Sequence, residues 1–384
     1  MSEKEIIFLH KEALNIHRIF YNWATLDIFF SSPRKVLRFL KLSFVPTILL
    51  IAISFSIYTI FTAENHIFMC YCMAFLGACY QASFKYYIFF IAHRNDFDKL
   101  VEYMKMLTKA SNLDFANDIR RKQLKKNLRL SLAIAKILII LFNATAVFVT
   151  LYGYNLTKCC PVFVKIPPII IADENPYKNI ISICFSIISY FLVVELIIVG
   201  DAIFLIIFAH FEGELRALAE VIERLNDAKV AQDDSKEILL FVYESHLNVL
   251  ANVRIFQKIY WHLNLHLIGT NFLYVCLLLY ITRFYDSPMV MYVTTLLLIF
   301  QLFLICFLGE ILRTRTEAIG EALYHTQWYE MKQSEKLTLL IMMAIGQEAV
   351  GLEAGGIMNL SLDTFVSVMK AAVSYGAIMY TFME

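Results

Sequence analysis

Long apolar runs separated by short polar segments dominate the chain and predict membrane-spanning helices. A bilayer core about 30 Å thick requires about 20 mostly apolar residues in a helix. Six runs reach that length, and a seventh region divides into a short apolar piece, a glycine-rich break and a final apolar helix. We place the spans at residues 40–61, 67–91, 131–154, 180–209, 263–282 and 288–312, and the divided one at 335–346 and 362–383.

The segment between the fourth and fifth spans, residues 210–262, is polar but periodic. Leu215, Leu218 and Ile222 recur at helical spacing, and after a polar stretch a second such run leads into the fifth span. We therefore expect a cytoplasmic helical hairpin that contacts neighbouring subunits. A solvated loop with some helix is the alternative.

The distribution of Lys and Arg predicts the orientation, because basic residues gather in the cytoplasmic segments of membrane proteins. Alternate flanking segments, beginning with the N-terminal one, carry 25 Lys and Arg against 4 in the others. This places the N-terminus in the cytoplasm and, after seven crossings, the C-terminus outside. Asn155 begins a sequon in a predicted outer loop and is a candidate glycosylation site.

The composition is that of a membrane protein, and the sequence shows no motif that indicates an enzyme. Hydrophobic residues make up 59% of the chain and charged residues 17%, against about 45–50% and about 25% in soluble domains. The net charge of +1 gives no reason to expect nucleic acid. Neither a phosphate-binding loop nor a catalytic constellation is visible, so we expect no enzyme, no cofactor and no metal site. The sequence leaves the redox state of Cys159 and Cys160 open.

Ionisable residues inside spans are costly in lipid and therefore informative. Glu195 and Asp201 lie within the fourth span, whereas Lys85 and Lys136 lie near the inner ends of the second and third. The two acids are expected to pair with these lysines or to face a water-filled cavity.

Aromatic, Met and hydroxyl side chains collect in the outer halves of several spans. An apolar pocket with a few polar groups suits a small, nearly neutral ligand, although the same residues also suit ordinary helix packing. The candidate ligand-binding residues are Met73, Tyr80, Phe148, Thr150, Ser186, Tyr190, Met291, Tyr292 and Thr295.

The final helix carries small and hydroxyl side chains on one face. Ser367, Ala371, Ser374 and Ile378 share a stripe that continues to Phe382. Such a stripe fits either close helix packing or a narrow pore.

Motifs in the C-terminal third resemble those of the insect odorant receptors. Ala322, Tyr324, Trp328 and Tyr329 fit the AxYxxxWY signature of that family. A second stretch matches the family's loop between the two halves of helix 7 and its continuation, through Gln347, Leu352, Ala354, Gly355, Leu360, Ser361, Phe365, Ser374 and Tyr375. Ala349 departs from the pattern, because the family usually has proline there.

The resemblance implies a subunit of a tetrameric, non-selective cation channel gated by an odorant. It implies a ligand site between helices 2, 3, 4 and 6, and a pore lined by the last helix. The pore and gate residues would be Ser374, Ile378, Thr381 and Phe382. Because the chain is short and its 210–262 segment compact, we expect an odorant-specific tuning subunit that assembles with the odorant co-receptor in the plasma membrane of an olfactory sensory neuron dendrite.

These expectations define one seven-helix unit of inverted topology over residues 1–384. Its parts are a cytoplasmic segment at 1–39, helices 1–4 at 40–209, the cytoplasmic hairpin or anchor region at 210–262, helices 5, 6 and 7a at 263–346, and a loop with the pore helix 7b at 347–384. The sequence cannot name the odorant or the subunit ratio.

Three alternatives are weighed against this interpretation. The ending Tyr375 to Phe382 also resembles that of the related gustatory receptors, which would change the ligand class but not the mechanism. A G-protein-coupled receptor would need its N-terminus outside. A secondary transporter would suit the broken last helix and the acids of the fourth span, but no inverted repeat is visible.

Overall fold

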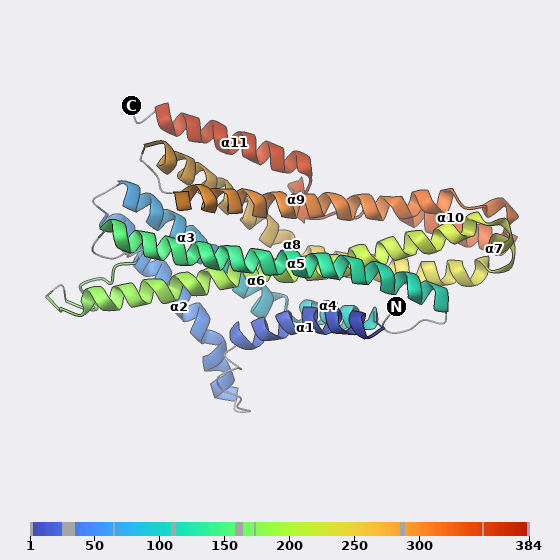
Figure 1. Ribbon diagram of the computed structural model, residues 1–384, viewed down its shortest axis with the longest axis horizontal. Coiled ribbons are helices and arrows are strands. Elements are labelled where there is room, and N and C mark those ends of the chain that lie inside the picture. The colour runs from blue at the N-terminus through green and yellow to red at the C-terminus, as the bar shows by residue number, and fades with distance from the viewer. Residues whose placement is uncertain are drawn as a thin grey trace.

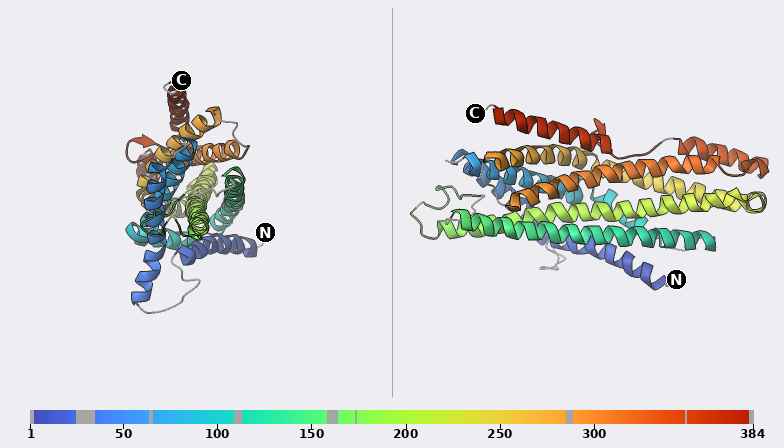
Figure 2. Two further views of the ribbon diagram at one scale, coloured as in Figure 1. Left: turned by 90° about the vertical axis from the view of Figure 1, so that its left-hand side faces the viewer. Right: turned by 45° about the horizontal axis from the view of Figure 1, so that its top comes forward.

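The protein is almost entirely helical in the computed structural model, which describes residues 3–24, 35–63, 66–108, 113–157, 164–172, 174–284, 289–347 and 349–381. Figures 1 and 2 show an elongated bundle with α11 at one edge and α1 at the opposite one. Its helices are α1 (Glu3–Ala24), α2 (Lys35–Phe61), α3 (His66–Tyr87), α4 (Arg94–Met106), α5 (Asp114–Thr157), α6 (Lys178–Ile222), α7 (Ala228–Asp233), α8 (Ser235–Phe284), α9 (Met289–Tyr324), α10 (Gln333–Gly346) and α11 (Leu362–Thr381). Short helical turns are η1 (Ile88–Ala92), η2 (Glu223–Asn226) and η3 (Trp328–Glu330).

Five stretches of the described helices are long and apolar enough to cross a bilayer. They are Leu42–Phe61, Asp114–Leu151, Lys178–Asn226, Ser235–Leu279 and Tyr292–Tyr324. The prediction of an α-helical membrane protein is thereby confirmed. The predicted count of seven crossings also requires α3 and α11, and it stays a prediction. In α3, Gln81 and Lys85 reduce the apolar character of the helix.

Three helices are much longer than a membrane is thick. α5, α6 and α8 contain 44, 45 and 50 residues. At 1.5 Å per residue they measure about 65–75 Å, roughly twice the apolar thickness of a bilayer. Part of each helix must therefore extend into water.

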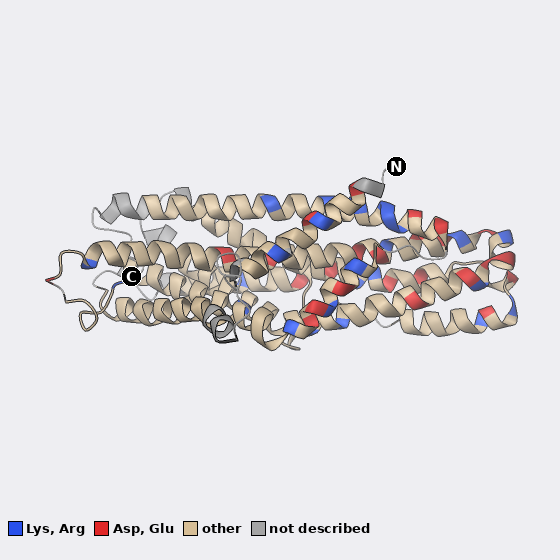
Figure 3. Cartoon of the chain, turned by 90° about the horizontal axis from the view of Figure 1, so that it is seen from below, with Lys and Arg blue, Asp and Glu red and all other residues tan. Residues whose placement is uncertain are grey.

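Charged residues gather at one end of the bundle, as Figure 3 shows. There Arg120 of α5 donates to both carboxylate oxygens of Glu214 of α6, at 2.7 and 2.6 Å. Asp96, beside α8, accepts from Lys258 at 2.9 Å, and this ammonium group lowers the pKa of Asp96 to about 2. Ion pairs thus join α5 to α6 and α4 to α8 in the part of the bundle that carries the charged residues.

A compact turn connects α10 to α11. Its two short strands, β1 (Glu353–Ala354) and β2 (Met358–Asn359), pair antiparallel. Gly355 and Gly356 between them have φ of 63° and 66°, a region that side chains other than glycine rarely adopt. The segment then packs on α9, where a Cβ at Gly309 would stand 2.5 Å from the carbonyl oxygen of Leu360. Glycine at position 309 therefore permits the close approach that positions the start of α11.

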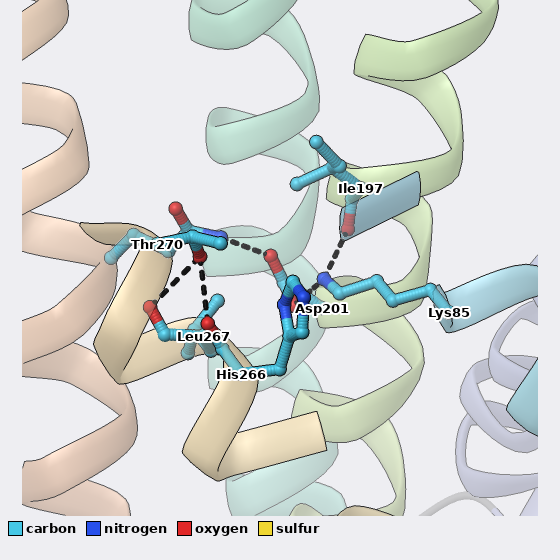
Figure 4. A network of polar contacts seen from close by, with 7 residues as sticks. Lys85, Ile197, Asp201, His266, Leu267 and Thr270 are labelled. Carbon is cyan, nitrogen blue, oxygen red and sulfur yellow. Dashed lines mark hydrogen bonds and ion pairs between the residues drawn. The ribbon is translucent and has the colours of Figure 1, made fainter. Parts of the chain in front are cut away.

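A buried ion pair joins α3, α6 and α9 (Figure 4). Lys85 Nζ lies 2.5 Å from Asp201 Oδ1 and also donates to the carbonyl oxygen of Ile197 at 2.9 Å. From α9, Gln301 Nε2 donates to Asp201 Oδ2 at 2.5 Å. Both carboxylate oxygens are therefore satisfied inside an apolar bundle.

We expected the acids of α6 to pair with Lys85 or Lys136 or to face a water-filled cavity. The pairing of Asp201 with Lys85 is confirmed. Lys136 pairs with Glu12 of α1 instead, at 2.5 Å. Glu195 is half-buried and forms no ion pair among the described residues.

We predict that the effects of substituting Lys85 and Asp201 on the stability of the fold depend on each other. Lys85→Met or Asp201→Leu alone leaves one charge buried without its partner, which costs about 3–5 kcal/mol. The double variant Lys85→Met/Asp201→Leu should recover most of that loss. Thermal unfolding of the detergent-solubilised protein, followed by size-exclusion chromatography, measures the effect.

An exposed ion pair between α5 and α6 provides the control. Lys122 and Glu220 lie 3.0 Å apart, and the lysine side chain is 64% exposed. Lys122→Met and Glu220→Leu should each cost less than about 1 kcal/mol. Single variants at Lys85 and Asp201 that unfold at the wild-type temperature would contradict the coupling, as would a double variant no better than the worse single one.

Candidate binding cavity and exposed helix face

A cavity of about 150 Å³ lies inside the bundle, next to the Lys85–Asp201 ion pair. Ile197 and Gln301 contact that pair and also line the cavity. The lining comes from α3, α5, α6, α8 and α9, and is mostly apolar. It consists of Tyr71, Ala74, Phe75, Ala78, Gln81, Phe142, Thr145, Ala146, Val149, Tyr190, Val193, Val194, Ile197, Tyr274, Leu278, Thr294, Leu297, Leu298 and Gln301.

Each of four helices contributes one face to this lining. In α5 the lining positions are 142, 145, 146 and 149, and in α6 they are 190, 193, 194 and 197. α9 repeats the spacing at 294, 297, 298 and 301, and α3 at 71, 74, 75 and 78. Positions i, i+3, i+4 and i+7 form one side of a helix, so each helix turns a single stripe towards the cavity. Ala74, Ala78 and Ala146 leave space where larger side chains would fill it.

The cavity can hold a small apolar molecule. Engineered cavities of about 150 Å³ are known to bind benzene. Among the described residues, no group of three His, Cys, Asp or Glu could hold a metal ion. The chemistry that the lining offers is therefore apolar contact with a few hydrogen bonds.

The structure places the predicted ligand residues unevenly. Tyr190 lines the cavity, and Ser186 is buried one turn away on α6. Met73, Tyr80, Phe148 and Tyr292 are exposed on the outside of the bundle. Thr150 donates to carbonyl oxygens of its own helix, Thr295 is half-buried, and the Met291 side chain lies outside the described residues. Their part in ligand binding stays a prediction.

Several lining residues that the sequence analysis missed are direct neighbours of predicted ones. Ala74 follows Met73, Gln81 follows Tyr80, Val149 follows Phe148, and Thr294 precedes Thr295. One residue turns a helix by about 100°, enough to exchange an inward side chain for an outward one. The small side chains of Ala74, Ala78 and Ala146 were the sequence feature that could have identified the faces of α3 and α5 that line the cavity.

α11 packs on α8 with one side and leaves the opposite side uncovered in this single chain. Ala372 is buried against Val275 and Cys276. The exposed side runs along positions 363, 366, 367, 370, 373, 374, 377 and 378 and therefore includes Ser374 and Ile378. The Thr381 side chain and Phe382 lie outside the described residues, as does the Asn155 side chain.

Two helices connect the cavity to α11. α8 lines the cavity with Tyr274 and, two residues earlier, packs the ring of Phe272 against Tyr375, with 5.7 Å between ring centroids. α9 lines the cavity with Gln301 and, two residues later, packs Phe303 against Phe365 at 5.5 Å. A movement of α8 or α9 at the cavity would therefore be transmitted to α11 through these ring contacts.

Solved structures share this fold. The structure of the insect olfactory receptor OR5 from Machilis hrabei in complex with eugenol is similar over 100% of both chains, with a TM-score of 0.80 and 16% sequence identity. A second structure of the same receptor gives a TM-score of 0.76 with 15% identity over 99% of both chains. At such low identity the likeness shows the fold alone.

Sequence relatives and a family profile agree on the assignment. Odorant receptor 2a of Drosophila melanogaster is 36% identical over 74 residues, 19% of each chain. The odorant receptor coreceptor of Ooceraea biroi is 32% identical over 75 residues, 20% of this chain and 16% of the relative. The matches thus span a fifth or less of these relatives' length. The sequence profile described as 7tm Odorant receptor matches residues 43–373. Because that profile covers most of the chain, the protein belongs to the odorant receptor family, as its C-terminal motifs predicted.

Proposed function

We propose that this protein is an odorant-gated subunit of a non-selective cation channel. Membership of the odorant receptor family indicates a receptor and not an enzyme, as we expected. The observation that carries the proposal is the mostly apolar cavity between α3, α5, α6, α8 and α9. A volatile is a small molecule of low polarity, and such a lining gives it a site that water competes for poorly.

In the proposed topology the chain crosses the membrane seven times, with its N-terminus in the cytoplasm. The excess of Lys and Arg supports this orientation, because it falls on the segments next to the charged end of the bundle. The crossings are the five long spans together with α3 and α11. The extensions of α6 and α8, joined through η2 and α7, then form the cytoplasmic hairpin, and α10 lies beside them as the first half of a divided seventh helix.

The exposed side of α11 is proposed to line the pore. Four copies around an axis would place Ser374 and Ile378 towards the ion path, with Thr381 and Phe382 at its outer end. A ring of apolar side chains in a narrow pore excludes water and thus ions. A ligand opens the pore only through its stronger binding to the open arrangement of α8 and α9. Phe272 and Phe303 are the contacts through which these helices would move α11.

The proposed partner is the odorant co-receptor, with which this tuning subunit would form a heterotetramer in the plasma membrane of an olfactory sensory neuron. Short matches to co-receptors of several insects support a shared assembly. Lipid would cover the apolar outer surface of the bundle.

Filling the cavity should weaken the response to odorants. Ala146 is 1% exposed and lines the cavity, so Ala146→Phe occupies the space that a ligand needs. We expect the odorant concentration for half-maximal current to rise by at least about tenfold, a loss of about 1.4 kcal/mol of binding energy. Whole-cell currents from cells that also express the co-receptor measure this value.

The next residue of α5 offers a matched control. Val147 is 43% exposed and faces away from the cavity, so Val147→Phe should leave odorant potency unchanged. Equal responses of the Ala146→Phe variant and the wild type, at equal surface expression, would show that the cavity is not the odorant site.

Replacing an apolar gate residue by a polar one should produce a leak. Ile378→Ser would hydrate the proposed constriction, and we expect a larger cation current without odorant. Val366→Ser is the control, because both side chains are 44% exposed on the same side of α11 and Val366 lies three turns earlier. An unchanged resting current in Ile378→Ser, or an equal leak in Val366→Ser, would contradict a gate at Ile378.

A further inference from the structure

A charged side chain lies well inside α11, the helix that is proposed to line the pore. α11 is 20 residues long, and its charged residues are Asp363 and Lys370. Asp363 belongs to the first turn, whereas Lys370 lies about 12 Å along the helix from its start at Leu362. A helix of this length is about as long as the apolar core of a bilayer is thick. A spanning α11 therefore carries Lys370 inside that core and not at its edge.

Lys370 has no polar partner within the part of the chain that the structure describes. Its side chain is exposed and takes part in no hydrogen bond or ion pair there. Lys85 of α3 differs, because it is buried and pairs with Asp201. A lysine in a membrane segment is costly in lipid, and such residues face the interior of a bundle or a water-filled cavity. The interior of this chain's own bundle is excluded for Lys370, because it lies on the uncovered side of α11.

The neighbours of Lys370 on that side of α11 are polar as well. Ser367 and Ser374 lie one turn before and one turn after it, Asp363 lies two turns before it, and all three are exposed. Residues three or four apart are neighbours on a helix surface, so these four residues form a continuous polar line. Water next to this line would solvate it, and a pore along α11 would supply that water.

We propose that Lys370 faces the ion path and that its positive charge limits the conductance of the channel and the passage of divalent cations. The inference rests on the proposed function, in which the exposed side of α11 lines the pore. It adds a residue of this subunit that determines the relative permeability to divalent and monovalent cations.

The physical basis is repulsion between the ammonium group and the ions that pass it. This repulsion is proportional to the charge of the ion, so it is twice as large for Ca²⁺ as for Na⁺ at the same distance. Ile378, the proposed constriction, lies about 12 Å further along α11. Lys370 therefore acts on ions on the inner side of the constriction, and its charge affects permeation and not the response to the ligand.

Removal of the charge tests this role. In outside-out patches from cells that express the protein with the co-receptor, we measure odorant-evoked single-channel currents. Lys370→Gln should raise the unitary conductance by about 1.5-fold or more, and the permeability to Ca²⁺ relative to Na⁺ by about twofold or more. Lys370→Arg keeps the charge and should keep both values. Odorant potency should be unchanged in both variants, and the evoked currents show that the variants fold and assemble.

Chemical restoration of the charge gives a matched control within one variant. Lys370→Cys should behave as Lys370→Gln does. A positively charged methanethiosulfonate reagent in the pipette, on the inner side, should return its conductance to about the wild-type value, whereas a negatively charged reagent should not. The wild type treated with the same reagents controls for other cysteines, among them the exposed Cys184.

The inference is overturned if Lys370→Gln keeps the wild-type conductance and Ca²⁺ permeability, or if Lys370→Arg changes them as much as Lys370→Gln does. Reduced surface expression of Lys370→Gln, with wild-type conductance in the channels that remain, would assign the lysine to subunit contact and would overturn it too. A complex that conducts with no volatile would instead defeat the proposed function.

Discussion

The ion pair between Lys85 and Asp201 is the interaction on which the arrangement of the bundle depends. A charge alone in an apolar interior is strongly unfavourable, so the two residues hold α3 and α6 in one register, and Gln301 adds α9 through the second carboxylate oxygen. These three helices also contribute most of the cavity lining. The pair therefore fixes the relative positions of these helices at one end of a mostly apolar cavity.

The ion pair lies at one end of the cavity, and another part of the lining comes from the helix on which α11 packs. Ile197 and Gln301 are bonded to the ion pair, whereas Tyr274 and Leu278 come from α8, on which α11 packs. In the proposed mechanism, a ligand in the cavity displaces α8 and the part of α9 beyond Gln301 more than the residues that are bonded to the ion pair. In the proposed mechanism, this asymmetry directs binding energy towards the pore helix and away from general loosening of the bundle.

Much of the fold could be predicted from the sequence, because apolar runs of membrane length leave few alternatives to helices. The run at 40–61 ends where α2 ends, at Phe61, and the pairing of Asp201 with Lys85 was one of the arrangements expected from the cost of buried charge. The rotation of each helix could not be predicted. Apolar residues occupy both the lipid-facing and the inward sides, so periodicity does not distinguish Tyr80 from Gln81 or Phe148 from Val149. Only packing between helices that are distant in sequence decides which of two neighbours lines the cavity.

In the proposed mechanism, one membrane protein complex both binds the odorant and conducts ions. Outside-out patches excised from cells that express this chain with the co-receptor, bathed in solutions free of nucleotides, test it most directly. A volatile applied to the outer face should open a cation current in such a patch. Patches that stay silent while intact cells respond, or a current that appears only when GTP is supplied on the inner side, would contradict it.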